Sequence, residues 1–240
     1  MTDMSDNPDL AIVTGTSGGI GAAVARTLRT GGLEVVGISR SAAPETTLRV
    51  DLGDLDALQT ALAPLVSGRR VRAIVHSAAL QTLGAAGTVS ADEWLATLRP
   101  NVVALDVMVG VALEGLKAAQ GAVIAISSVH GTATSRAIAV YAATKGALEA
   151  WTRAAAIDLG PEITVNALAV GATDTPMLWA HLDPSGPEAR TLVERTPAKR
   201  IADPQEIADL VAYLAGPSAR FITGSVYRID GGALSLLGTE

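Results

Sequence analysis

The fold of this chain is decided by Leu10-Ala-Ile-Val-Thr14-Gly15-Thr-Ser-Gly-Gly19-Ile-Gly21. Residues 10–14 form a short apolar run that predicts a buried strand, and residues 22–30 predict a helix. The glycines between them allow a tight turn and a close approach of the backbone to a ligand, while the start of the helix offers free N–H groups to a phosphate. A glycine-rich turn alone is a weak signal. Placed between this strand and this helix, it predicts a site for the pyrophosphate of a dinucleotide.

Further apolar runs predict six more strands, at residues 33–38, 47–51, 71–76, 122–126, 163–168 and 225–229. Helical patterns separate them, at residues 55–65, 91–118 with a break near Pro100, 137–159 and 204–214. This alternation predicts an α/β fold: a doubly wound, Rossmann-type, mostly parallel sheet of about seven strands with helices on both faces. With 240 residues, 49% of them hydrophobic, we expect a single domain over residues 1–240. Within it we expect residues 1–9 to be a flexible N-terminus and residues 173–200 to form a lid over the substrate.

Composition argues against several classes of function. A net charge of -6 leaves no basic surface for nucleic acid, and no apolar run approaches the length that spans a bilayer. The chain has no cysteine, and its three histidines (His76, His130 and His181) lie far apart without metal-ligand spacing, so we expect no disulfide and no metal site. The polar stretch 1–9 lacks the pattern of a signal peptide. We therefore expect a soluble, cytoplasmic protein.

The second predicted strand ends in Ser39-Arg40, at the position where such folds recognise the ribose of a dinucleotide. An acidic residue there would accept a hydrogen bond from the 2′-hydroxyl of NAD, whereas Arg40 can pair with a 2′-phosphate. This favours NADP(H) and leaves NAD(H) as an alternative in which Arg40 is a solvated loop charge. Asp51, at the end of the third predicted strand, is either an adenine contact or the N-cap of the helix 55–65.

Four further residues indicate chemistry. Tyr141 and Lys145 are four residues apart in a predicted helix, so both leave one face with β-carbons roughly 5 to 6 Å apart. A nearby ammonium lowers the pKa of a phenol and makes it a general acid, although the spacing alone also fits a solvated helix face. Ser128 ends a buried strand on the side where parallel sheets bind ligands. Asn101, beside Pro100, is either a polar surface residue or an amide that reaches into the fold.

From Ile12 to Gly232 the chain resembles the short-chain dehydrogenases/reductases, the small single-domain kind that includes 3-oxoacyl-carrier-protein reductases. Thr14-Gly15 with Gly19-Ile20-Gly21 resembles the cofactor motif of that family, and Tyr141 with Lys145 resembles its catalytic motif. The family's catalytic tetrad would then comprise Asn101, Ser128, Tyr141 and Lys145, at matching spacings. Asn166-Ala167, Asp174-Thr175-Pro176, Ile222-Thr-Gly224 and Asp230-Gly-Gly232 are further family marks.

The resemblance implies NADP(H)-dependent hydride transfer between nicotinamide and a ketone or secondary alcohol, with Tyr141 as general acid/base. Ser128 would hold the reacting oxygen, Lys145 would lower the tyrosine pKa and hold the nicotinamide ribose, and Asn101 would order a water. A small-molecule substrate and a homotetramer are also implied. The cofactor would contact Gly15, Thr16, Ser17, Gly19, Ile20, Gly21, Ser39, Arg40, Asp51, Leu52, Ser77, Ala78, Tyr141, Lys145, Gly171, Thr173 and Thr175. The substrate would contact Gln81, His130, Ser135, Met177 and Trp179, a mostly uncharged set that suggests a neutral ketone or a carrier-linked 3-oxoacyl group.

The sequence departs from the family pattern in two places, because His76-Ser77-Ala78-Ala79 replaces Asn-Asn-Ala-Gly and Val170-Gly171 replaces Pro-Gly. Other classes remain as alternatives. A nucleotide-sensing binding protein would not need the tetrad, and a sugar-nucleotide epimerase would need a larger C-terminal domain. A carrier-bound enoyl reductase would space its tyrosine and lysine farther apart.

Overall fold

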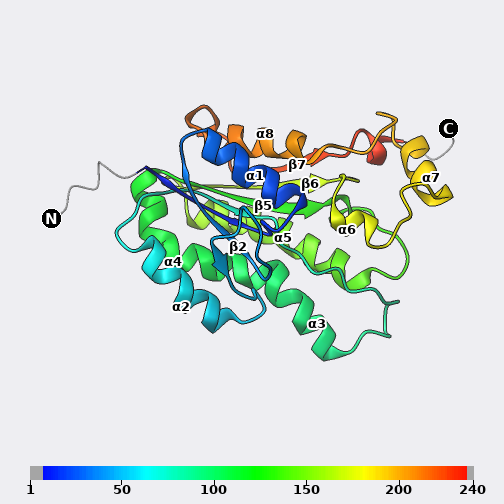
Figure 1. Ribbon diagram of the computed structural model, residues 1–240, viewed down its shortest axis with the longest axis horizontal. Helices are drawn as coiled ribbons and strands as arrows, with labels where there is room; N and C mark the ends of the chain where they lie inside the picture. Colours follow the sequence, from blue (N-terminus) through cyan, green and yellow to red (C-terminus); the bar gives the residue numbers. More distant parts are fainter. Residues whose placement is uncertain (1–7, 237–240) are drawn as a thin grey trace.

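A single parallel β-sheet runs through the molecule between two layers of helices (Figure 1). Residues 8–236, the part of the chain that the computed structural model describes, contain seven strands in the order β3-β2-β1-β4-β5-β6-β7. The strands are β1 (Leu10–Thr14), β2 (Glu34–Ser39), β3 (Leu48–Arg49), β4 (Val71–His76), β5 (Ala122–Ser128), β6 (Thr164–Val170) and β7 (Val226–Ile229). The predicted fold class is confirmed.

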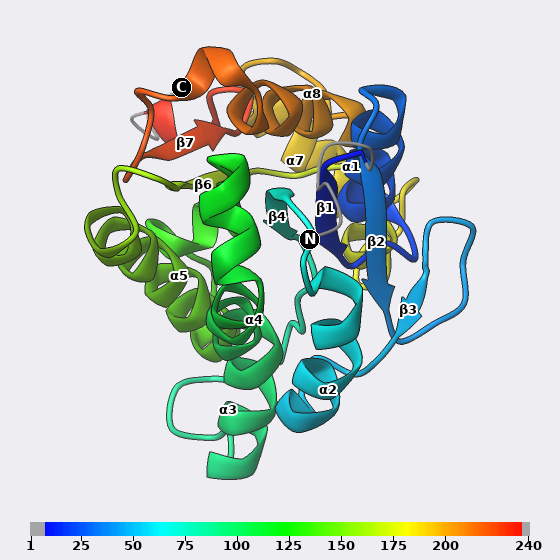
Figure 2. The same ribbon diagram turned by 90° about the vertical axis from the view of Figure 1, so that its left-hand side faces the viewer.

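Helices cover both faces of the sheet (Figures 1 and 2). One face is covered by α1 (Gly19–Thr30) and α8 (Pro204–Ala215), and the other by α2 (Leu55–Val66), α4 (Ala104–Ala119) and α5 (Ala139–Asp158). The other α-helices of the described residues are α3 (Ala91–Leu98), α6 (Pro176–Trp179) and α7 (Pro187–Arg195). Figure 1 shows α6 and α7 beyond the carboxyl ends of the strands, where parallel sheets bind ligands.

The core lies on both sides of the sheet because successive strand residues face opposite ways. Leu10 and Ile12 of β1 pack in one buried cluster with Leu58 of α2, whereas Ala11 and Val13 pack in the other cluster, against α1 and α8. A strand buried on both faces needs apolar residues at every position. This is why the strands appear in the sequence as continuous apolar runs rather than as alternating patterns.

The predicted break near Pro100 is a π-helical turn. This turn, Arg99–Val103, joins α3 directly to α4, with no loop between them. Proline lacks the N–H that an α-helical turn requires, and the wider turn accommodates the missing bond. Asn101 lies in this turn and is fully buried, so it is not a surface residue.

Several predicted boundaries are wrong. The third strand pairs only at Leu48–Arg49, and the N-cap of α2 is Asp54 rather than Asp51. Of the predicted flexible N-terminus, residues 1–7 lie outside the described part of the chain, whereas Asp9 is held by ion pairs to Arg70 and Arg72. The segment 173–200, which we expect to form the lid, contains the short helices α6 and α7.

The strand order reverses between β1 and β4, because the chain leaves β1 toward β2 on one side and returns to β4 on the other. The glycine turn after β1 therefore lies beside Ser77 and Ala78, which follow β4. A β-carbon added to Gly15 would lie 2.9 Å from the backbone nitrogen of Ala78. In open parallel sheets, such a switch point is where ligands bind.

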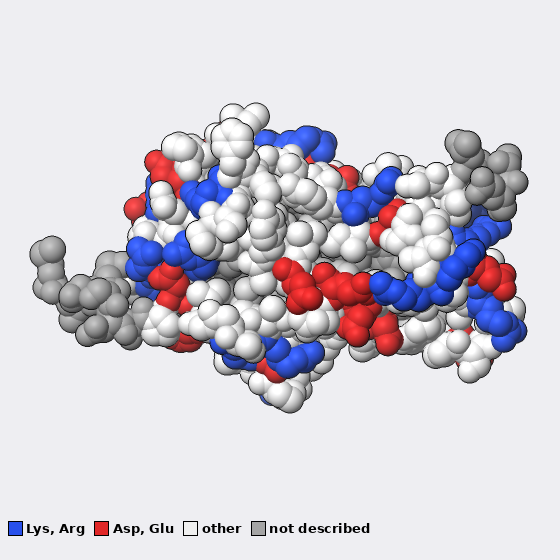
Figure 3. All heavy atoms as spheres, turned by 90° about the horizontal axis from the view of Figure 1, so that it is seen from above, with Lys and Arg blue, Asp and Glu red and all other residues white. Residues whose placement is uncertain are grey.

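Charges of both signs share the surface above α1 and α8 (Figure 3). Arg200, for example, makes a two-pronged ion pair with Glu206, with Nη2 2.7 Å from Oε1. No helix within residues 8–236 combines the length and the apolar character that crossing a membrane requires. Within the same range, His, Asp and Glu side chains form no group of three that would hold a metal ion.

Candidate active site

The glycine turn prepares an anion site at the start of α1. Gly15 and Gly19 have φ of 75° and 54°, which favours glycine at both positions. A side chain on Gly15 would also meet the backbone of Ala78, and one on Gly19 would meet Thr175 at 2.9 Å. The N-cap, Gly18, supplies no capping side chain, and no acidic residue lies in the first turn. The first amides of α1 are therefore free to donate to a phosphate.

A cleft of about 850 Å³ lies beside this turn, at the ends of β1, β2 and β4. Its volume and its mixed polar and apolar lining fit a nucleotide cofactor. The predicted cofactor residues that line it are Gly15, Ser17, Gly19, Ile20, Ser39, Arg40, Asp51, Leu52, Ser77, Ala78 and Thr175. Gly18, Arg99 and Pro100 also line it and were not predicted. Arg99 stands next to the Pro100–Asn101 break, and that break was the signal in the sequence that this region approaches the site.

The other predicted cofactor residues do not line the cleft. Thr16 is buried, pairs with the Thr46 hydroxyl at 3.2 Å and borders a separate hollow of about 340 Å³ behind the glycine turn. Gly21 lies against the carbonyl of Gly15. The remaining four are Gly171, whose N–H donates to the Ile229 oxygen at 2.8 Å, Thr173, whose hydroxyl donates to Gly171, and the helix pair Tyr141 and Lys145.

At the end of β2 the cleft carries a cation and no carboxylate. Ser39 is buried and its hydroxyl oxygen accepts from the Ser41 N–H at 3.2 Å, while Arg40 is exposed and makes no ion pair with any residue from 8 to 236. Asp51 lines the cleft further along and accepts from the Gly53 N–H at 2.8 Å. This arrangement suits an anionic group on the ribose better than a hydroxyl that donates.

Hydrogen bonds to Thr14 and Asn101 hold the altered segment at the end of β4. The Thr14 hydroxyl oxygen accepts from the backbone N–H groups of Ser77 and Ala78, each at 3.0 Å. The His76 ring is fully buried, with Nδ1 3.0 Å from the Thr14 oxygen and Nε2 3.3 Å from the carbonyl oxygen of Asn101. His76 thus joins the end of β1 to the π-helical turn, in a position where the family pattern has asparagine.

The Asn101 amide holds the backbone of the loop after β4. Its Oδ1 accepts from the Leu80 N–H at 2.7 Å, and its Nδ2 donates to the Leu80 oxygen at 2.9 Å. The same Nδ2 donates to the Thr144 hydroxyl at 3.0 Å, and that hydroxyl donates to the Tyr141 carbonyl at 2.8 Å. Asn101 therefore connects the wall of the site to the helix that carries Tyr141 and Lys145.

Tyr141, Lys145 and Ser128 come together although they belong to α5 and β5. Lys145 Nζ lies 5.4 Å from the centre of the Tyr141 ring and donates to the Ile126 oxygen at 2.8 Å. The Ser128 hydroxyl is close enough to Tyr141 to lower its pKa by a hydrogen bond. All three side chains are largely buried. A phenol, a hydroxyl and an ammonium can together bind and protonate a carbonyl oxygen.

The expected effect of Lys145 on Tyr141 is not seen. Burial raises the pKa of Tyr141, and only the hydrogen bond with Ser128 acts in the opposite direction. Burial also lowers the pKa of Lys145 to about 8, against the opposing charge of Glu149. Desolvation disfavours the charged form of each group, and it is the largest cause of both shifts.

Glu149 lies beside Lys145 in the site and was not predicted. Glu149 is four residues after Lys145 on α5, is buried, and accepts from the Ser127 hydroxyl at 2.8 Å. Its negative charge favours the protonated form of Lys145. The signal was available, because a carboxylate at this spacing shares a helix face with the lysine.

The predicted substrate residues surround the same end of the sheet on three segments. His130 follows Ser128 and packs edge-on against Tyr141, with ring centres 6.2 Å apart, while its Nδ1 is shielded and has no partner. Burial lowers the pKa of His130. Gln81 is partly buried and Ser135 is exposed. Met177 lines the cleft.

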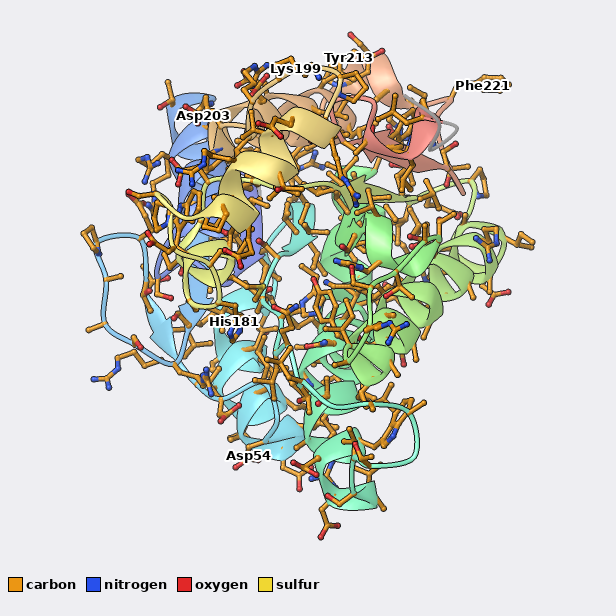
Figure 4. All side chains as sticks on the ribbon, turned by 90° about the vertical axis from the view of Figure 1, so that its right-hand side faces the viewer. Asp54, His181, Lys199, Asp203, Tyr213 and Phe221 are labelled. Carbon is orange, nitrogen blue, oxygen red and sulfur yellow. The ribbon has the colours of Figure 1, made fainter. Side chains whose placement is uncertain are left out.

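Trp179, in contrast, donates its Nε1–H to Asp174 Oδ1 at 2.6 Å and so is held within its own segment. Figure 4 looks onto this end of the molecule and shows the yellow segment that carries α6 and α7 in front of α1 and β2, with His181 at its lower edge. Of this segment, Thr175, Pro176 and Met177 line the cleft.

The fold and the glycine turn define a Rossmann-type protein of the dinucleotide-dependent oxidoreductase class. Residues 15–233 match the family model described as "Enoyl-(Acyl carrier protein) reductase". The chain belongs to the short-chain dehydrogenase/reductase family. As a member it is an NAD(P)-dependent enzyme of CH–OH and carbonyl groups, so the predicted family and enzyme class are confirmed.

Individual relatives agree over nearly the whole chain. The 3-oxoacyl-[acyl-carrier-protein] reductase of Vibrio cholerae is 31% identical, with 93% of this chain and 96% of that protein covered. A short-chain dehydrogenase/reductase from Serratia marcescens is 32% identical with a TM-score of 0.86, and 95% and 98% of the two chains are covered. A protein from Beutenbergia cavernae, described as a gluconate 5-dehydrogenase with bound NADP, is 29% identical with a TM-score of 0.87, and 97% and 99% are covered.

Proposed function

We propose that this protein is an NADP(H)-dependent reductase of ketones, with Tyr141 as the general acid and with the reverse oxidation of secondary alcohols available to it. One observation carries the proposal. Tyr141, Ser128 and Lys145 meet at the carboxyl end of the sheet, beside a cleft whose ribose end presents Arg40 and no free carboxylate. NAD(H) in place of NADP(H) is the alternative.

The residues of the cleft fit a dinucleotide. The free amides at the start of α1 would bind the pyrophosphate, and Arg40 with Ser39 would bind the ribose phosphate. The protein backbone at Ser77 and Ala78 would lie against the cofactor. When bound, the cofactor supplies or accepts the hydride. Gly171, Thr173 and Thr175 remain proposed contacts on the far side of the site.

The chain itself handles the proton and the developing charge. Tyr141 gives its phenolic proton to the carbonyl oxygen, and Ser128 donates a hydrogen bond to the same oxygen as charge grows. Lys145 keeps its ammonium beside the phenol and thereby stabilises the phenolate left after transfer. Asn101 would order a water that links Lys145 to solvent for the return of the proton.

The position of His130 favours a substrate that carries a second oxygen near the carbonyl. The ring is neutral at working pH because burial lowers its pKa, and an unpartnered Nδ1–H would cost more than an unpartnered lone pair. The tautomer with Nε2–H therefore offers one donor beside Tyr141. A 3-oxoacyl thioester, which is the substrate named for the Vibrio cholerae relative, has such an oxygen. Gln81, Ser135, Met177 and Trp179 would form the remaining walls, with residues 173–200 as the lid.

A homotetramer in the cytoplasm is the assembly and location that we infer. Phe221 is fully exposed, Tyr213 is half exposed, and Figure 4 shows both at the outer rim beside α8 and β7. Ile157, on α5, is 82% exposed. Large apolar side chains that are exposed on α5, on α8 and in the turn at residue 221 are typical of surfaces that a second subunit covers.

A panel of plain ketones, 3-oxo thioesters, hydroxyketones and secondary alcohols tests the proposal, with NADPH or NADH absorbance as the measurement. We expect reduction with NADPH and a preference for the substrates that carry a second oxygen. His130→Leu should remove this preference and leave plain ketones unaffected. An enzyme that binds NADPH but turns over none of these carbonyls would contradict the proposal.

A further inference from the structure

The second histidine of the site region, His76, has a position that the proposed mechanism does not use. Its ring is completely buried between Thr14 at the end of β1 and Asn101 in the π-helical turn. Both ring nitrogens lie within hydrogen-bonding distance of a partner, with Nδ1 3.0 Å from the Thr14 hydroxyl and Nε2 3.3 Å from the Asn101 carbonyl. A neutral imidazole donates from only one nitrogen, so the two partners decide which one.

The hydrogen bonds of Thr14 fix that choice. A hydroxyl has one proton to donate and two lone pairs that accept. Both lone pairs of Thr14 Oγ1 receive backbone N–H groups, from Ser77 and Ala78. The hydroxyl proton therefore goes to His76 Nδ1, which must be unprotonated, and the proton of the neutral ring is on Nε2 and is donated to the Asn101 oxygen. Burial and the nearby charge of Lys145 lower the pKa of His76 to about 4, which keeps the ring neutral.

The two ends of the ring reach different parts of the site. On the Nδ1 side, Thr14 holds the N–H groups of Ser77 and Ala78, which line the cofactor cleft. On the Nε2 side, the bond to the Asn101 carbonyl fixes the π-helical turn. From that turn, the Asn101 amide reaches the Leu80 backbone and Thr144 on the catalytic helix.

We propose that His76 is a positioning residue with two separable roles: its Nδ1 sets the cofactor-binding backbone through Thr14, and its Nε2–H sets Asn101 for turnover. The proposal rests on the proposed function, since its kinetic readouts are NADPH affinity and ketone reduction. The Nε2–H tautomer that it requires can be tested without measuring activity.

Two substitutions separate the roles because each retains one end of the ring. His76→Asn places an amide oxygen near the Nδ1 position, so it still accepts from Thr14 but cannot reach Asn101. His76→Gln places an amide nitrogen near the Nε2 position, so it still donates to Asn101 but leaves the Thr14 proton without its acceptor. Loss of one buried hydrogen-bond partner corresponds to roughly a five- to hundredfold change in an equilibrium or rate.

We expect His76→Asn to lower kcat by about tenfold and to keep the Kd for NADPH within about twofold of wild type. His76→Gln should show the reverse, a Kd weakened by about tenfold with kcat nearly unchanged. NADPH fluorescence gives the Kd, ketone reduction at saturating cofactor gives kcat, and thermal unfolding gives Tm. Ile74→Val is the matched control, because Ile74 is a fully buried neighbour on β4 that faces the core. It should lower Tm without changing Kd or kcat.

Nitrogen NMR of histidine-labelled wild type reads the tautomer directly, since the chain has only three histidines and His76→Gln identifies the signal of His76. An Nδ1–H signal would overturn the proposal, and so would variants in which Kd and kcat change together in proportion to the loss of Tm. A wild type that shows the Nε2–H signal and the NADPH effect of His76→Gln but reduces no ketone would overturn the proposed function instead.

Discussion

Lys145 Nζ lies 5.4 Å from the centre of the Tyr141 ring, and the backbone oxygen of Ile126 holds it there by a hydrogen bond of 2.8 Å. The ammonium is thus fixed in place by the sheet rather than free to follow the phenol. Lys145 is 2% exposed and Tyr141 is 8% exposed, so water screens their interaction poorly. At this depth, burial raises the pKa of Tyr141 and lowers that of Lys145.

Replacing Tyr141 by phenylalanine should abolish nearly all turnover and leave cofactor binding intact. The hydroxyl carries the proton in the proposed mechanism, while the ring packs in the core. The measurement is kcat for ketone reduction together with NADPH fluorescence on the same sample. Substantial turnover by pure Tyr141→Phe protein would mean that another group is the acid.

Activity should fall as pH rises above about 8, where Lys145 loses its proton. The pKa of this lysine is lowered from its ordinary value, so the ammonium is present below pH 8 and is lost above it. A profile of kcat/KM between pH 6 and pH 10 checks this, with Lys145→Met as the control that should lack the step and be weak in both turnover and cofactor affinity. A wild-type profile that stays flat through pH 9 would show that the charge of Lys145 is not needed.

Cofactor preference should depend on the two residues at the end of β2. Arg40→Ala should weaken NADPH binding by roughly ten- to hundredfold, because a charge-assisted pair with the ribose phosphate is lost. Ser39→Asp combined with Arg40→Ala should turn preference toward NADH, since a carboxylate repels the phosphate and accepts from the ribose hydroxyl. Comparing kcat/KM for both cofactors decides this, and an equal or better wild-type value with NADH would contradict it.

Stability should decrease when the pH falls below about 6.5. The pKa of His76 is near 4 in the folded protein and 6.5 as the reference value, so the unfolded chain takes up a proton first. The stabilisation is complete above pH 6.5 and is lost as the pH falls toward 4, at a cost on the order of 3 kcal/mol. Urea unfolding at several pH values measures it. His76→Gln, which does not titrate, should show a smaller dependence on pH; an equal slope would assign the effect to other groups.

An oligomer should be present at micromolar protein concentration, a tetramer if both exposed apolar surfaces are covered. Light scattering gives the mass, and a value near the 24.3 kDa of one chain would rule the assembly out. Phe221→Asp should reduce the mass, because an aspartate at a covered position would bury a charge.

The sequence by itself determined the order of strands and helices and the position of the glycine turn. Continuous apolar runs predict strands buried on both faces, and the glycines of 15–21 mark a turn where a side chain on Gly15 or Gly21 would collide with backbone. The spacing of four from Tyr141 to Lys145 sets their common helix face without knowledge of any other element. These features depend on local geometry, which a linear pattern records.

Only the tertiary structure decided how the site is connected. His76, Asn101 and Thr144 come from β4, a π-helical turn and α5, and their hydrogen bonds exist because these segments pack against one another. Tertiary burial also decided the pKa values, since the depth of Tyr141 and Lys145 in the fold outweighs their proximity along the helix. Sequence spacing gives the distance between two side chains on one helix, but desolvation depends on everything that the fold places around them.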